Sequence, residues 1–193
     1  MPLALSAAVA LVGSLGFASC LWMVFGSMTD VITNNNGICA TGSPYQVTPG
    51  HQCSSGSMVL IEVGGPGLFV FGAIATVGVL GLLGPRGVGH LLLMGTLVFG
   101  LLGWNFLHLR ASGDGTDAGN VFCGVLFLLM AAGGLIGLWP ILGLRWPRAD
   151  SARDTRRPLL VGARLRQQLY WAAFATGTLA GAFLGSAIVD SLV

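Results

Sequence analysis

Residues 3–28 read LALSAAVALVGSLGFASCLWMVFGSM and contain no charged side chain. As a helix, a stretch of about 20 residues crosses the ~30 Å hydrocarbon core of a bilayer. The stretch does not alternate apolar and polar residues with a period of two, so a membrane-spanning strand is not expected. Because lipid offers no hydrogen-bond partners, the backbone must pair within the segment, and the stretch predicts a transmembrane helix.

Four further apolar runs follow the first one. We expect the transmembrane helices at about 3–28, 58–83, 90–109, 121–144 and 169–190. The composition agrees, since 54% of the residues are hydrophobic and only 8% are charged, against about 25% charged in a typical soluble domain. The predicted fold is therefore all-α, a polytopic transmembrane helical bundle of five helices in a single integral membrane domain, residues 1–193.

The first run also contains LGFASC at residues 15–20, which resembles the cleavage box of a lipoprotein signal. A secretory signal has a basic segment before its apolar core, and no Lys or Arg precedes this one. The apolar stretch also continues past Cys20. We therefore expect a retained membrane helix.

The arginines predict the orientation of the bundle. Seven of them lie in the segment 145–168, and Arg86 lies in the short turn between the second and third predicted helices. With five crossings these eight share one side, whereas Arg110 alone lies on the other. The positive-inside rule then places the N-terminus in the cytoplasm and the C-terminus outside, in a plasma membrane.

The polar loop at residues 29–57 is expected to face outward and carries Cys39 and Cys53. In an oxidising compartment the two cysteines can form a disulfide, and closing a loop of about 15 residues stabilises a fold by ~3 kcal/mol in the chain-entropy model. The alternative is a metal site that uses both cysteines and His51. Their spacing matches no zinc pair, so no metal is expected.

Three polar residues are expected near the outer ends of the second and third helices: Glu62, Asn105 and His108. Asn105 and His108 are three apart and share a helical face. Such a group could carry protons, bind a cation or hold the backbone of the loop. Ionisable groups in a membrane are often functional, but the cost is small near the interface, where anchoring the loop is the simpler explanation.

Glycines recur every four residues in the fifth predicted helix, at Gly177, Gly181 and Gly185. A stripe of small residues lets two helices approach closely. We favour packing within the chain, with an oligomer or partner interface as the alternative. Tyr170 and Trp171, at the inner edge of the same helix, are expected to lie in the aromatic belt at the membrane interface.

The basic segment 145–168 is the one substantial cytoplasmic region that the sequence predicts. Anionic headgroups attract such segments by about 1 kcal/mol for each arginine near the surface. The arginines expected to contact lipid headgroups are Arg148, Arg153, Arg156 and Arg157. A nucleic acid partner is not expected, because one short tethered segment offers little basic surface.

Two short motifs, GSPY at 42–45 in the cysteine loop and GWNFL at 103–107, resemble a family of small, uncharacterised multi-pass membrane proteins of high-GC bacteria. In that family a Cys precedes a Gly-Pro-Tyr-like turn and a second Cys follows it. The resemblance covers residues 1–110 and implies a plasma-membrane location but no activity. The family often has an acidic residue after the final Leu of the second motif, where this chain has His108.

Motifs of catalysis are absent from the sequence: it has no phosphate loop, zinc-protease helix, nucleophile elbow or CxxC pair. No charged residue lies at the centre of an apolar run, as an ion-coupled pump would require. We expect a non-enzymatic accessory or scaffold subunit of a membrane complex, without cofactor or metal, whose partners are the lipid bilayer and other membrane subunits or a second copy. The alternative is a small-solute or ion transporter or channel.

Overall fold

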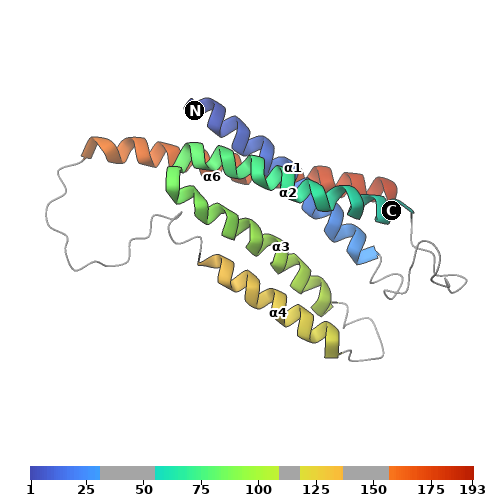
Figure 1. The fold of residues 1–193 in the computed structure, drawn as a ribbon. Helices are drawn as coiled ribbons and strands as arrows, with labels where there is room; N and C mark the ends of the chain where they lie inside the picture. The colour runs from blue at the N-terminus through green and yellow to red at the C-terminus, as the bar shows by residue number, and fades with distance from the viewer. Residues whose placement is uncertain (31–54, 109–117, 137–156) are drawn as a thin grey trace, which may run out of the picture.

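The computed structural model describes residues 1–30, 55–108, 118–136 and 157–193 (Figure 1). In these ranges the elements are helical: α1 (Leu3–Thr29), α2 (Ser55–Leu83), the 3-10 helix η2 (Gly84–Val88), α3 (Gly89–His108), α4 (Ala118–Leu135) and α6 (Arg157–Leu192). No strand occurs among the described residues. The all-α prediction is confirmed for this part of the chain.

Three helical stretches are long and apolar enough to cross a membrane: Leu3–Thr29, Gly56–His108 and Arg164–Leu192. The middle stretch comprises α2, η2 and α3, and it folds back on itself at Gly84, whose φ of 59° is readily adopted by glycine. The apolar part of α4, Val121–Leu135, is shorter. The fourth predicted helix extends to residue 144, beyond the described range, so the count of five crossings stays a prediction.

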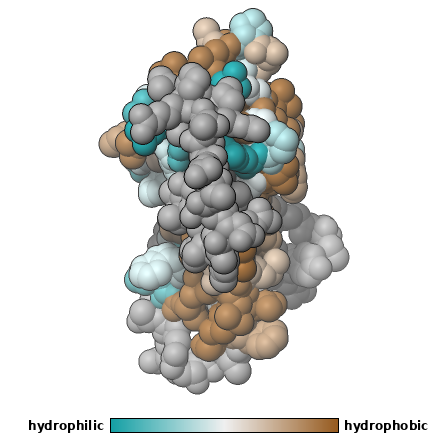
Figure 2. Space-filling view, turned by 90° about the vertical axis from the view of Figure 1, so that its left-hand side faces the viewer, coloured by the Kyte–Doolittle hydropathy of each residue, from teal (hydrophilic) through white to brown (hydrophobic). Residues whose placement is uncertain are grey.

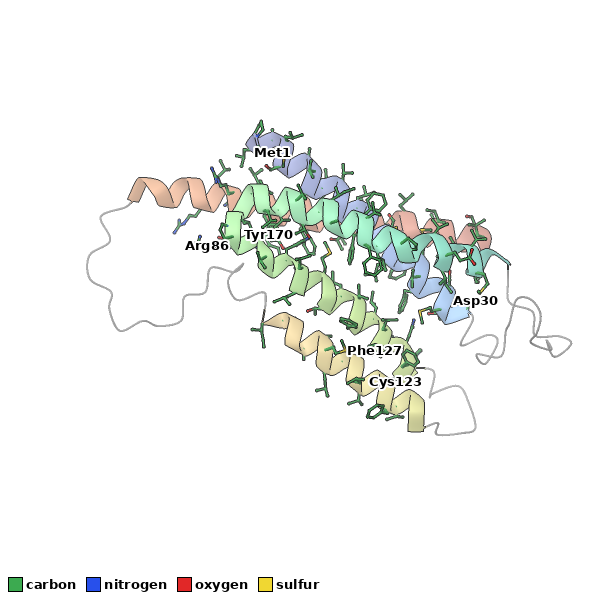
Figure 3. All side chains as sticks on the ribbon, in the orientation of Figure 1. Met1, Asp30, Arg86, Cys123, Phe127 and Tyr170 are labelled. Atoms are coloured by element: carbon green, nitrogen blue, oxygen red, sulfur yellow. The ribbon has the colours of Figure 1, made fainter. Side chains whose placement is uncertain are left out.

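Helix α1 packs between α2 and α6, and α3 pairs with α4 beside this group (Figure 1). Met1, Arg86 and Tyr170 lie toward one end of the molecule and Asp30 lies toward the other (Figure 3). We call these the Arg86 end and the Asp30 end. Successive helices run in alternating directions between the two ends, and α6 leads from the Arg86 end to the C-terminus.

Glycines bring the backbones of α1 and α2 into direct contact. A Cβ atom added at Gly13 would collide with the backbone of Ala75, and one at Gly78 would collide with the backbone of Ala10. Between helices in lipid there is little hydrophobic driving force, so association depends on such close van der Waals contact. Small residues therefore determine how closely the backbones of α1 and α2 approach each other.

Hydroxyl side chains inside these apolar helices bond to the carbonyl one turn earlier. Thr76 Oγ1 donates to the Gly72 carbonyl at 2.8 Å, and Thr178 Oγ1 donates to the Phe174 carbonyl at 2.6 Å. This local bond satisfies the hydroxyl without a second helix. It explains how these two threonines are tolerated in segments that are otherwise apolar.

Helix α2 runs without interruption through Pro66. A proline flanked by glycines, as Pro66 is by Gly65 and Gly67, can kink or break a helix, but α2 is not broken here. Proline lacks the N–H that would bond the carbonyl four residues earlier, which here belongs to Glu62. Glu62 is exposed and lies near the start of α2, where water or a headgroup can take the place of the missing donor.

Two apolar clusters hold the helices together. Toward the Arg86 end, Ala10, Val79, Leu82 and Tyr170 join α1, α2 and α6. Further along, Phe17, Leu21, Ala75 and Met94 join α1, α2 and α3. Helix α3 thus reaches the α1–α2–α6 group through its side chains, whereas α4 packs mainly on α3.

Several predicted features lie outside the described residues. These are the proposed disulfide partners Cys39 and Cys53, the alternative ligand His51, and Arg148, Arg153 and Arg156. Arg157 begins α6, but its side chain is not described. The two described cysteines are free thiols: Cys20 is buried and Cys123 is half-buried.

Candidate functional site

Asn105 is the one buried member of the predicted polar group, with 6% of its surface exposed. Its Oδ1 lies 3.3 Å from Thr29 Oγ1, and the same threonine hydroxyl lies 2.9 Å from the Phe25 carbonyl. Asn105 therefore joins α3, near the Asp30 end, to the last turn of α1.

The amide of Asn105 cannot be fully satisfied in this position. Thr29 has one hydroxyl hydrogen, and the shorter contact is to the Phe25 carbonyl. If the amide is turned over, its nitrogen donates to Thr29 Oγ1, and the threonine hydroxyl can still donate to the Phe25 carbonyl. In the orientation with Oδ1 toward Thr29, Nδ2 is buried and has no hydrogen-bond partner among the described residues. In either orientation, one end of the amide is buried without a hydrogen-bond partner in the described part of the chain.

Glu62 and His108 have different surroundings from Asn105. His108 is exposed and stacks on Trp104, one turn earlier, with ring centroids 5.6 Å apart. Glu62 is exposed on α2. Within the described ranges, no hydrogen bond or ring contact links Glu62 to Asn105 or His108. The structure thus connects Asn105 to Thr29 instead of uniting the three predicted residues.

A second polar contact at the Asp30 end fixes how the chain enters α2. Ser57 Oγ donates to Asp30 Oδ2 at 2.8 Å, and Ser57 is fully buried. Ser27, one turn before Asp30, is also fully buried, and its hydroxyl has no described partner. These groups surround the junction of α1 with α2, so the polar residues at this end join helices to each other.

The Arg86 end contains a buried polar pair that the sequence did not predict. His90 and Tyr170 are both 0% exposed, and His90 Nδ1 lies 3.1 Å from Tyr170 Oη. Tyr170 was expected in the interfacial aromatic belt, and this expectation is wrong. The tyrosine turns inward because the first turn of α3 offers its hydroxyl a partner inside the bundle.

The His90–Tyr170 pair is packed against a third aromatic ring and contains one hydrogen bond. Phe174 stacks on Tyr170 with centroids 5.9 Å apart, and its ring meets His90 edge-on at 5.4 Å. The pairing that satisfies the tyrosine hydroxyl has it donate to Nδ1, which leaves the proton of a neutral imidazole on Nε2. Nε2 is buried and has no partner among the described residues. The imidazole is thus a buried, half-satisfied group where α1, α2, α3 and α6 meet.

The predicted glycine stripe of α6 faces α1. A Cβ atom added at Gly177 would lie 2.7 Å from the Leu11 carbonyl oxygen, and one at Gly185 would lie 2.6 Å from the Ser19 carbonyl oxygen. At Gly181 it would collide with the Leu15 carbonyl. Ser19 Oγ also lies 3.0 Å from the Gly181 carbonyl. This glycine face is therefore occupied within the chain.

Among the described residues, no three His, Cys, Asp or Glu side chains lie close enough together to hold a metal ion. The fold defines an all-helical protein with helices long and apolar enough to cross a membrane. No family model, curated protein or solved structure matches the chain significantly.

Proposed function

We propose that this protein is an accessory or scaffold subunit of a plasma-membrane complex and has no catalytic activity of its own. The proposal includes five crossings, a cytoplasmic N-terminus and an extracytoplasmic C-terminus. The observation that carries it is the close contact of α1 with both of its neighbours, where glycine backbones leave no space for even one added carbon.

This contact extends along most of α1. On one side Gly13 of α1 and Gly78 of α2 mark backbone contacts with the partner helix. On the other side Gly177, Gly181 and Gly185 follow α1 over two turns. A permeating solute needs a path lined by polar groups, and the interfaces of α1 have no room for one. Such packing suits a rigid support.

The alternative, a small-solute or ion transporter or channel, would use Glu62, Asn105 and His108 as part of a path. Glu62 and His108 are exposed while Asn105 is buried against Thr29. Transporters of this kind often bind substrate at broken helices, whereas α2 continues through Pro66. Both points favour the support role.

Native mass spectrometry after extraction of the membrane into polymer-bounded lipid discs tests the proposal. We expect a discrete assembly heavier than the 19.9 kDa chain, and the reconstituted chain should not release trapped ions or small solutes from vesicles. A mass of one chain at every concentration, together with solute release, would favour the transporter instead.

A substitution on α4 makes the test sharper. An added Cβ at Gly133 meets nothing within 4 Å, whereas one at Gly134 would lie 2.7 Å from the Leu92 carbonyl oxygen of α3. Gly133→Leu should leave the chain folded but weaken an assembly that packs on this face of α4. Gly134→Leu should disturb the α3–α4 pair itself, and the two variants thus separate assembly from folding.

A further inference from the structure

The arginines at the Arg86 end are placed by the buried pair described above. His90 Nδ1 and Tyr170 Oη are 3.1 Å apart, so the start of α3 is tied to α6 at this point. Arg86 lies in η2, four residues before His90, and Arg166 lies on α6, four residues before Tyr170. Residues four apart on a helix share a face, so Arg166 continues the face of α6 that carries Tyr170 toward α3.

Both side chains are exposed, and neither forms an ion pair within the described ranges. Hydrophilic residues gather on this end of the molecule in its upper part, where α1, α2 and α6 lie, whereas the lower part is largely apolar (Figure 2). Arginine binds phosphate through paired N–H groups, so one exposed arginine on each side of this helix crossing favours a phosphate ligand.

The neighbouring surface distinguishes a lipid from a free anion. Immediately after Arg86, the exposed residues are apolar: Val88 is 56% exposed, Leu91 51% and Leu92 50%. They continue from the arginine along α3, a helix apolar enough to lie in the membrane. A ligand that is anionic at one end and apolar over the rest fits both features.

We propose that Arg86 and Arg166 bind the phosphate of an anionic phospholipid, with its acyl chains along the start of α3 near Val88, Leu91 and Leu92. The site differs from the diffuse attraction expected of the segment 145–168, because it is built from two helices held in register by His90 and Tyr170. The lipid would join α3 to α6 at the membrane surface, outside the buried pair.

Native mass spectrometry of the full chain tests this site, with phosphatidylglycerol and phosphatidylcholine offered in equal amounts. The wild type should retain phosphatidylglycerol preferentially. Arg86→Gln with Arg166→Gln should lower this retention by about fivefold for each arginine removed. Since both side chains are exposed, the unfolding temperature without lipid should not change.

The matched control removes the same charge elsewhere, with Arg110→Gln and Arg164→Gln. Arg164 is two residues from Arg166 and therefore points to nearly the opposite side of α6. Equal loss of lipid in the control would mean that retention follows net charge, and it would overturn the site. Equal retention of both lipids by the wild type would overturn it as well. Displacement of the lipid by millimolar inorganic phosphate would show a free-anion site instead.

Discussion

Tyr170 can lose its hydroxyl while its ring stays packed on Phe174, which isolates the energy of its contact with His90. In Tyr170→Phe, His90 Nδ1 remains buried and loses its hydrogen-bond partner. Leaving such a group unpaired costs about 1–3 kcal/mol. We therefore expect the free energy of unfolding, measured by SDS titration in mixed micelles, to fall by about this amount.

The control for this contact is a double-mutant cycle with His90→Leu. Removing both polar partners leaves no orphaned group, so the double variant should be less destabilised than the sum of the single variants. Additive losses would show that the two side chains stabilise the bundle independently, and the interpretation of a buried polar pair would be wrong.

Contacts between residues far apart in the chain, such as the His90–Tyr170 pair, could not be predicted from the sequence. His90 and Tyr170 are 80 residues apart, and each stands near the edge of an apolar run, where an interfacial position is the simplest expectation. Nothing in their local spacing indicates that they meet. The sequence identifies Asn105 as a polar residue in an apolar run, but its partner Thr29 belongs to a helix whose register the sequence does not give.

The sequence predicted the packing face of a helix better than it predicted contacts between particular side chains. A four-residue glycine repeat marks one face whatever the partner is, so the stripe of α6 was visible before its partner α1 was known. In contrast, the sequence does not show that α2 continues through Pro66. Proline predicts a lost hydrogen bond, but whether the helix breaks depends on what replaces that bond and on the neighbouring helices.

At the scale of helix pairs, Gly181→Ala tests the contact between α6 and α1. The new Cβ would collide with the Leu15 carbonyl, and the helices must move apart to accept it. Overpacking of this kind costs typically about 1–3 kcal/mol, which SDS titration should detect as a lower free energy of unfolding.

Gly133→Ala is the matched substitution on α4, where the added carbon meets open space. It should be neutral or slightly stabilising, because alanine favours helix over glycine by up to about 1 kcal/mol. If Gly181→Ala and Gly133→Ala lower the free energy of unfolding by the same amount, the loss comes from replacing a glycine within a helix and not from the α1–α6 contact.

For the molecule as a whole, the predicted disulfide between Cys39 and Cys53 reports on the compartment of the Asp30 end. Peptide mapping without reductant should yield one cross-linked peptide that joins the two residues, while Cys20, which is buried as a free thiol, stays unlinked. Free thiols at both loop positions in protein from native membranes would contradict an oxidising environment for this loop.

The course of the chain between the two ends gives the strongest test of topology. Helix α1 starts at the Arg86 end, α2 returns to it, α4 returns to it again, and α6 leaves from it (Figure 1). If α4 did not cross, α6 would have to start on the opposite side from α1. Five crossings require that the two ends of α6 face opposite compartments, and the positive-inside rule predicts that its arginine-rich start lies inside.

Cysteine labelling of α6 in intact cells measures this directly, in a chain whose own cysteines are replaced by serine. Gly162 and Ser191 are exposed near the start and the end of α6. A membrane-impermeant maleimide should label Ser191→Cys in intact cells and Gly162→Cys only after the membrane is opened. Labelling of both in intact cells would exclude a crossing by α6. The reverse pattern would contradict the predicted orientation of α6, and it is the result expected if α4 does not cross or if the whole bundle is inverted.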